Sequence, residues 1–180
     1  MAICKIKIGL IWIMTADTTI ENKVTASGIL RLDLEVYRPT MPFVTFDIKP
    51  YLYEELIIVE KSFRTAMDSV NWEDNSGKAV SVICSVDAII PQWVYMLITA
   101  KLKPFATSIA FGTEQDHLIK CWERSVENAD LSLYYDKKVA VKASEHIPDA
   151  LYICVSTILA GKVATLMYGE PGLPKVIRKY

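Results

Sequence analysis

Apolar positions in the second half of the chain switch between the continuous runs of buried strands and the three-to-four-residue spacing of helices. Residues 80–84 form a short apolar run, which is typical of a strand buried on both faces. Pro91 suits the first position of a helix, and helical spacing continues from it to Lys103. The pattern then predicts a strand over 108–111, a helix over 114–128, a strand over 139–143, a helix over 148–159 and a strand over 165–168.

The first half of the chain is less regular. Residues 24–36 alternate in part between apolar and charged side chains, as a half-buried strand does. Two prolines interrupt the pattern, and residues 43–48 then predict a second strand. A short helix is expected over 62–70. We expect the two early strands to extend one edge of the sheet that the later elements build.

Two stretches, about residues 79–112 and 138–169, follow the same pattern. In each, the proline that opens the helix precedes the glycine after the last strand by 21 residues, and a tyrosine holds the same helix position: Pro91, Tyr95 and Gly112 in one, and Pro148, Tyr152 and Gly169 in the other. Such fixed spacing indicates a duplicated β-α-β unit, although unrelated β-α-β units also look alike. Two units in series predict an α/β protein with a four-stranded, mostly parallel sheet and an N-terminal strand extension.

Composition narrows the class of protein. The chain has 180 residues, 52% of them hydrophobic, with few glycines, prolines and cysteines, so we expect one packed domain over 21–180. The formal net charge of −1 argues against nucleic-acid binding, which needs clustered Lys and Arg. The four cysteines include no CxxC pair, and scattered cysteines are typical of a reducing compartment. We therefore predict a cytoplasmic protein.

Residues 1–20 are expected to form an N-terminal extension or arm outside the domain. Their longest apolar run, 8–13, has only 6 residues, whereas a membrane-spanning helix needs about 20 residues, so no membrane association is expected. No convincing cleavage site follows the run, which disfavours a secretory signal. Met14 precedes a polar segment and is an alternative start of the functional protein.

Ligands of open α/β sheets bind beyond the carboxyl ends of the strands, near helix N-termini. Four predicted loops have this position, and their small residues are the candidate cofactor-binding residues: Ser85, Gly112, Ser144 and Gly169. We expect the four loops to lie along one edge of the sheet. The sequence does not identify the cofactor, because the GxGxxG and GxxxxGK[ST] phosphate loops are absent from it.

Reactive side chains occur in the same loops. Cys84 lies before a helix entry, where a thiolate is stabilised, so it is a candidate nucleophile or metal ligand; equally, it fits a small core residue beside a helix-capping Asp87. His146 is a candidate base or metal ligand, and the plainer alternative is a surface histidine. These three residues are the candidate catalytic set, and with Glu170 they are the candidate metal ligands.

Four segments carry a resemblance to a known family: a strand that begins at Lys23, Phe46-Asp-Ile-Lys49, Cys84-Ser-Val-Asp-Ala-Ile-Ile-Pro-Gln-Trp-Val-Tyr-Met96 and Tyr168-Gly-Glu-Pro171. Together they resemble the bacterial family called domain of unknown function 2480, from about Glu21 to the C-terminus. The resemblance implies no activity. It implies an association with iron–sulfur cluster assembly, because genes of the family often neighbour assembly genes. Family members carry a cysteine after the last motif where this chain has Gly172, which weakens a cysteine-based role.

Three functions remain open at this stage. The one we favour is a non-catalytic ligand-binding or assembly-accessory protein, linked to iron–sulfur or metal homeostasis. The second is a small-molecule enzyme with Cys84 as nucleophile and Asp87 or His146 as base. The third is a purely structural protein that acts through a protein partner or as a homodimer.

Overall fold

The computed structural model describes residues 28–180, so the extension expected over residues 1–20 lies outside the described residues. The strands are β1 (Ile29–Leu32), β2 (Phe43–Asp47), β3 (Ala79–Ile83), β4 (Ser108–Phe111), β5 (Lys138–Val141), β6 (Thr165–Tyr168) and β7 (Lys175–Lys179). The α-helices are α2 (Glu60–Ser69), α3 (Gln92–Leu102), α4 (Glu114–Glu127) and α5 (Asp149–Leu159). The pattern of the sequence predicted each of these elements except β7.

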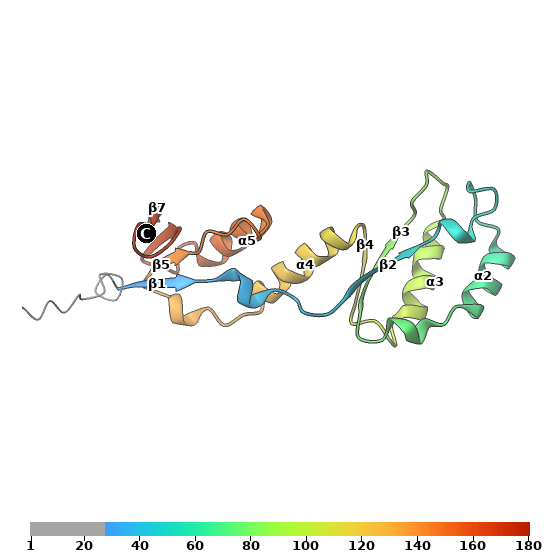
Figure 1. Cartoon of the computed structure of the whole chain (residues 1–180), viewed down its shortest axis with the longest axis horizontal. Coiled ribbons are helices and arrows are strands. Elements are labelled where there is room, and N and C mark those ends of the chain that lie inside the picture. The colour runs from blue at the N-terminus through green and yellow to red at the C-terminus, as the bar shows by residue number, and fades with distance from the viewer. Residues whose placement is uncertain (1–27) are drawn as a thin grey trace, which may run out of the picture.

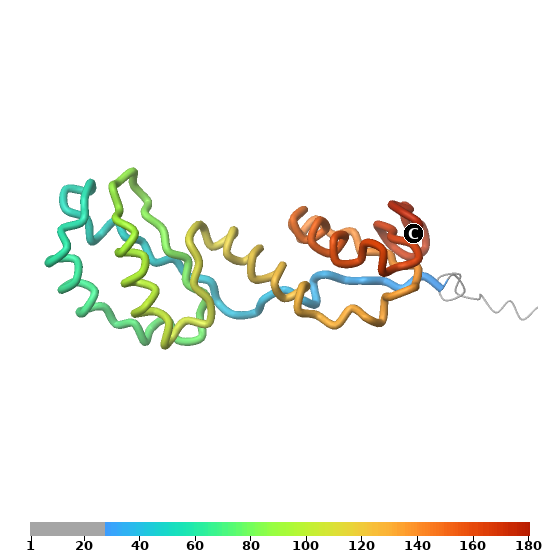
Figure 2. Tube along the Cα trace, turned by 180° about the vertical axis from the view of Figure 1, so that it is seen from behind, coloured from blue at the N-terminus to red at the C-terminus, as the bar shows by residue number. Residues whose placement is uncertain are grey.

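The described elements form two lobes that lie end to end along the molecule (Figure 1). The first lobe contains a sheet in the order β1-β5-β6-β7 and helix α5, and the second contains a sheet in the order β2-β3-β4 with helices α2 and α3. Helix α4 lies between the lobes, where it contacts α5 on one side and β2 and β3 on the other. The view from behind shows the same arrangement (Figure 2).

The expectation of one four-stranded sheet is therefore wrong. Each β-α-β stretch builds its own sheet, because β1 pairs in parallel with β5 and β2 pairs in parallel with β3. In a single sheet, the two β-α-β stretches would have joined through the edges formed by β5 and β3. Strands β1 and β2 occupy those edges instead, and they therefore belong to different sheets. The sheet of the second lobe is entirely parallel, whereas β7 adds one antiparallel strand to the first.

Both lobes have the same order of strands around their crossover helix. An early strand pairs with a middle strand, and a helix then leads to the outer strand, β4 or β6. Each helix covers its sheet with residues spaced four apart: Val94, Ile98 and Leu102 in α3, and Leu151, Val155 and Leu159 in α5. After the outer strand, the N–H of Gly112 donates to the Val82 carbonyl, and the N–H of Gly169 donates to the Val141 carbonyl.

Each lobe has a hydrophobic core organised by a buried tryptophan. In the first core, the indole N–H of Trp122 donates to the Leu34 carbonyl at 2.9 Å, which attaches α4 to the segment after β1. In the second core, the indole N–H of Trp72 donates to the Met67 carbonyl at 2.9 Å. Tryptophan contributes a large apolar surface, and its N–H requires a partner when it is buried. Two separate cores explain why the molecule is elongated.

Candidate functional site

The carboxyl ends of the parallel strands face different regions in the two lobes. Strand β1 runs toward the middle of the molecule, and β2 runs away from it (Figure 1). Ser144 follows β5 in the first lobe, whereas Ser85 follows β3 in the second. The single edge expected for Ser85, Gly112, Ser144 and Gly169 is therefore not formed, because the chain builds two sheets in place of one.

The candidate reactive residues are divided in the same way. Cys84 and Asp87 follow β3 in the second lobe, and Cys84 packs partly against that core. His146 and Glu170 lie in the first lobe, after β5 and β6. The structure thus does not bring Cys84 and His146 together. Within residues 28–180, no group of three or more His, Cys, Asp or Glu side chains is arranged to hold a metal ion.

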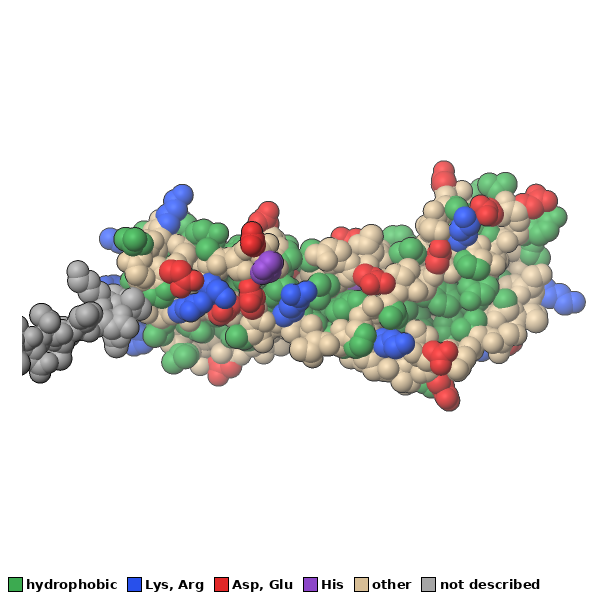
Figure 3. All heavy atoms as spheres, viewed as in Figure 1, with side chains coloured by type: hydrophobic (Ala, Val, Ile, Leu, Met, Phe, Trp, Pro, Cys, Tyr) green, Lys and Arg blue, Asp and Glu red, His purple; other side chains and the backbone are tan. Residues whose placement is uncertain are grey.

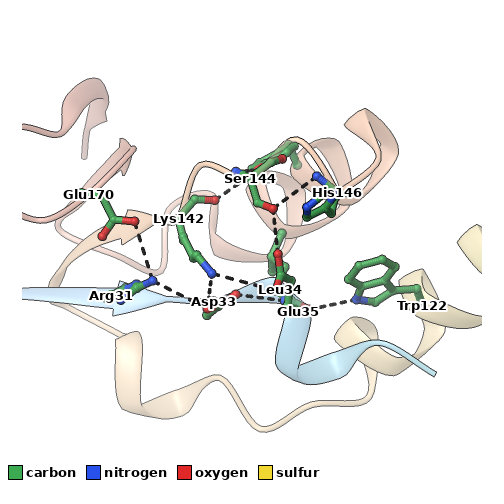
Figure 4. Close-up of polar contacts among 10 residues, drawn as sticks. Arg31, Asp33, Leu34, Glu35, Trp122, Lys142, Ser144, His146 and Glu170 are labelled. Atoms are coloured by element: carbon green, nitrogen blue, oxygen red, sulfur yellow. Dashed lines mark hydrogen bonds and ion pairs between the residues drawn. The ribbon is translucent and has the colours of Figure 1, made fainter. Parts of the chain in front are cut away.

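A connected polar cluster lies at the carboxyl edge of β1 and β5 in the first lobe (Figure 4). The Lys142 ammonium donates to a carboxylate oxygen of Asp33 at 2.9 Å, and the Glu35 N–H donates to the other oxygen at 3.1 Å. Burial disfavours the Asp33 carboxylate, but these two donors outweigh it and lower its pKa. The hydrogen bond to Asp33 is also the main reason that the pKa of Lys142 is raised.

Ser144 joins this cluster to helix α5. Its hydroxyl donates to a Glu35 carboxylate oxygen at 2.7 Å and accepts from the His146 N–H at 3.3 Å (Figure 4). Its backbone N–H donates to the Tyr152 hydroxyl at 3.0 Å, and that hydroxyl donates to the Lys142 carbonyl at 3.1 Å. Burial raises the pKa of the Tyr152 hydroxyl and so further favours its protonated form, which is the form that donates.

The cluster extends to the loop after β6. Arg31 lies 3.6 Å from a carboxylate oxygen of Glu170 and 3.8 Å from one of Asp33 (Figure 4). Gly169 has a φ of 110°, which a side chain would strain, and it turns the chain so that Glu170 faces β1. Of the sequence candidates, Ser144, His146 and Glu170 therefore belong to this edge, whereas Arg31, Asp33, Glu35 and Lys142 were not identified in advance.

An open pocket of about 770 Å³ lies beside the polar cluster. Its polar lining consists of Glu35, Lys142, Ser144, Glu145, His146, Asp149, Tyr152 and Tyr168. Three of these side chains are carboxylates and one is an ammonium group that Asp33 already neutralises. The rings of Tyr152 and Tyr168 meet edge to face, with centroids 5.5 Å apart. The pocket therefore combines excess negative charge with aromatic rings.

The corresponding edge of the second lobe is simpler. Asp47 accepts hydrogen bonds from the Ser85 hydroxyl at 2.6 Å and from the Ser85 and Lys49 N–H groups, both at 3.0 Å. Burial opposes ionisation of Asp47, but these donors outweigh it, so its pKa is lowered. Both carboxylate oxygens of Asp47 accept hydrogen bonds from within this small cluster, and the cluster fixes the loop after β3.

His117 is a further residue whose importance the sequence did not reveal. It is 1% exposed on α4, where its Nε2 lies 2.8 Å from the Ser108 hydroxyl and its Nδ1 lies 3.1 Å from the Ser81 hydroxyl. Burial, with smaller contributions from Lys120 and Arg124, lowers its pKa. A neutral histidine thus links α4 to β3 and β4. The sequence feature that could have indicated this role is a serine on each of two otherwise apolar strands, Ser81 and Ser108.

The fold and this edge define a two-lobed α/β protein with one parallel sheet, one mixed sheet and a polar pocket at the carboxyl ends of β1 and β5. Among the described residues, no helix is long and apolar enough to cross a membrane. Residues 18–176 match the family model described as a protein of unknown function, DUF2480, and the chain belongs to this family. No curated protein and no solved structure matches the chain.

Proposed function

We propose that the protein is a non-catalytic binding protein that takes a small organic ammonium compound at the pocket of the first lobe. The observation that carries this proposal is the pocket lining, in which the carboxylates of Glu35, Glu145 and Asp149 occur together with the rings of Tyr152 and Tyr168. Carboxylates accept hydrogen bonds from an ammonium group, and aromatic faces attract it. The pocket also lies beyond the carboxyl ends of parallel strands, where ligands of such sheets bind.

Lys142 has a positioning role in this proposal. Its ammonium group is held by Asp33 at 2.9 Å and lies 3.9 Å from Glu35, so it does not neutralise the whole pocket. Ser144 restrains the Glu35 carboxylate from the other side, at 2.7 Å. One oxygen of Glu35 is thereby fixed in place, which reduces the entropy lost when a ligand binds.

The proposed iron–sulfur or metal role gains no support from the described residues, because the four candidate ligands lie in two lobes. The enzyme that would use Cys84 with His146 lacks the required juxtaposition for the same reason. The cytoplasmic location stays a prediction.

Titration calorimetry with 1,4-diaminobutane as the probe tests the proposal. We expect saturable binding to the wild type and affinity reduced by about tenfold or more in Glu35→Gln, which keeps the shape of the side chain but removes its charge. Asp47→Asn, at the matching edge of the second lobe, is the control and should bind like the wild type. Sodium acetate should not bind. Equal affinity in the two variants, or no saturable heat with the diamine, would contradict the proposal.

A further inference from the structure

The two lobes carry matching apolar grooves beside their outer strands. The groove of the second lobe, about 450 Å³, is lined by Val82, Tyr95, Thr99, Ile109, Ala110 and Phe111. The groove of the first lobe, about 330 Å³, has the corresponding lining of Val141, Tyr152, Ser156, Leu166, Met167 and Tyr168, and Asp149 lines it in addition. The first groove has an additional wall, because Ile177 of β7 lines it as well. The groove of the first lobe therefore differs from that of the second in the carboxylate of Asp149 and in the strand that covers it.

In the first lobe, β7 completes the edge of the sheet. It pairs antiparallel with β6, and its five residues include Lys175, Arg178 and Lys179. Basic residues on an edge strand discourage pairing with a further strand. The charged strand β7 thus protects this edge of the first lobe from pairing with another strand.

In the second lobe, β4 is an edge strand without such protection. Its four residues, Ser108–Phe111, carry no charge, and within residues 28–180 no strand pairs with its outer side. The side chain of Phe111 is 67% exposed. Hydrophobic side chains also gather over neighbouring α3 in the space-filling view (Figure 3). An uncharged, apolar edge of this kind is a template for strand addition.

The backbone direction fixes which groups face outward. The Gly112 N–H donates to the Val82 carbonyl of β3, and backbone groups alternate sides along a strand. Ile109 and Phe111 therefore direct their N–H and C=O groups away from β3. Their side chains lie on the α3 face, since the Ser108 hydroxyl on the opposite face contacts His117 of α4.

We propose that β4 pairs antiparallel with β4 of a second copy of this chain, across a two-fold axis at Ala110. In this register, Ile109 of each copy faces Phe111 of the other and exchanges two backbone hydrogen bonds with it. The two Ala110 residues meet in the closely spaced, non-hydrogen-bonded position, which their methyl groups fit. The two three-stranded sheets join into one, and the Ile109–Phe111 pairs cover the grooves that remain open in each copy.

The chemistry of β4 favours a second copy over other occupants. A two-fold pairing sets each residue of 108–111 against another uncharged residue, so no like charges meet. Apolar and aromatic partners face each other, which is a favourable cross-strand combination. The surface is therefore complementary to itself, as a two-fold interface must be.

Disulfide trapping tests the pairing directly in the full chain. In a non-hydrogen-bonded antiparallel pair the Cα atoms are about 4.5 Å apart, which a disulfide can bridge. We expect Ala110→Cys to form a dimer on mild oxidation, and mass spectrometry should identify a peptide in which a disulfide joins position 110 of the two copies. Ile153→Cys is the control, because Ile153 is 70% exposed on α5 and away from any strand edge. Absence of the peptide linked through position 110 would overturn the proposal.

Light scattering after gel filtration gives an independent readout. The wild type should show about twice the chain mass of 20.3 kDa, and Phe111→Lys should raise the dimer dissociation constant by about tenfold or more. Ile153→Lys places the same charge at a similarly exposed position of the first lobe and should leave the mass unchanged. A wild type that stays at 20.3 kDa at every concentration, or a Phe111→Lys dimer of undiminished strength, would contradict the proposal.

Discussion

The two lobes share an order of strands but differ at both places where such a sheet can make contacts. At the carboxyl edge, the first lobe has a polar cluster and an open pocket, whereas the second has a compact Asp47–Ser85 cluster. At the outer edge, β7 covers β6 in the first lobe, whereas β4 has no partner among the described residues. These two differences are the basis on which we propose a ligand pocket in the first lobe and an association surface in the second.

The largest effects should come from matched deletions in the two cores. Leu102 and Leu159 are the last residues of α3 and α5, and both are 0% exposed. Leu102→Ala and Leu159→Ala should each lower the free energy of unfolding by about 2–5 kcal/mol, because each leaves a cavity. Urea denaturation followed by far-ultraviolet circular dichroism measures both.

The same pair of variants tests whether the lobes behave as the single domain expected from the sequence. Because α4 contacts both lobes, we expect one unfolding transition in either variant. Two separate transitions, with only the substituted lobe shifted, would show that α4 does not couple the lobes.

An intermediate effect should come from His117. Its pKa is lowered in the folded protein, so the unfolded chain binds the proton first as the pH falls. Stability should be constant above pH of about 6.5 and should fall below it by up to about 1.4 kcal/mol for each pH unit, until His117 titrates in the folded state. Denaturant titrations between pH 7.5 and 5 measure this.

The second histidine of the chain provides the control for that experiment. His117→Gln removes the titrating group while keeping a side chain that can bond both serines, so the fall between pH 7.5 and 5 should become smaller. His146→Gln changes an exposed residue and should retain the fall. If His146→Gln flattens the pH dependence of stability and His117→Gln does not, the buried His117 is not the source of that dependence.

The smallest effect compares two tyrosines at matching helix positions. The Tyr152 hydroxyl takes part in hydrogen bonds with Ser144 and Lys142, whereas no hydrogen bond joins the Tyr95 hydroxyl to another described residue. Tyr152→Phe should cost about 0.5–1.5 kcal/mol of stability, and Tyr95→Phe should cost less. Thermal denaturation of both variants checks the difference. An equal loss in both variants would contradict a stabilising role for the hydrogen bonds of the Tyr152 hydroxyl.

Local pattern predicted most of the elements but not how they combine. The strands at 108–111 and 165–168 are confirmed with the predicted bounds, because glycine and proline mark their ends. The division into two sheets depends on which strand fills each free edge, and that choice involves partners more than 100 residues apart, such as Leu30 and Val139. Strand β7 has only two apolar residues, Val176 and Ile177, and they are adjacent between charged residues, so it shows neither alternation nor a continuous apolar run.

The candidate site was predicted only in part, for a related reason. Sequence spacing placed Ser144, His146 and Glu170 in loops after strands, and the structure has these three residues at one edge. Asp33 and Glu35 were read as the exposed face of a strand, because their partner Lys142 is over 100 residues away in the chain. The expected contact of His146 with Cys84 and Asp87 depended on a shared sheet, and it is not formed because the two sheets are separate.

Amide hydrogen exchange at the two outer strands tests the contrast between the lobes most directly. Leu166 and Tyr168 face β7 across the register of the first sheet and should exchange slowly at every protein concentration. Ile109 and Phe111 should exchange rapidly in dilute protein and slowly once the concentration favours pairing of β4 between two copies. Rapid exchange of Ile109 and Phe111 at all concentrations would contradict the account.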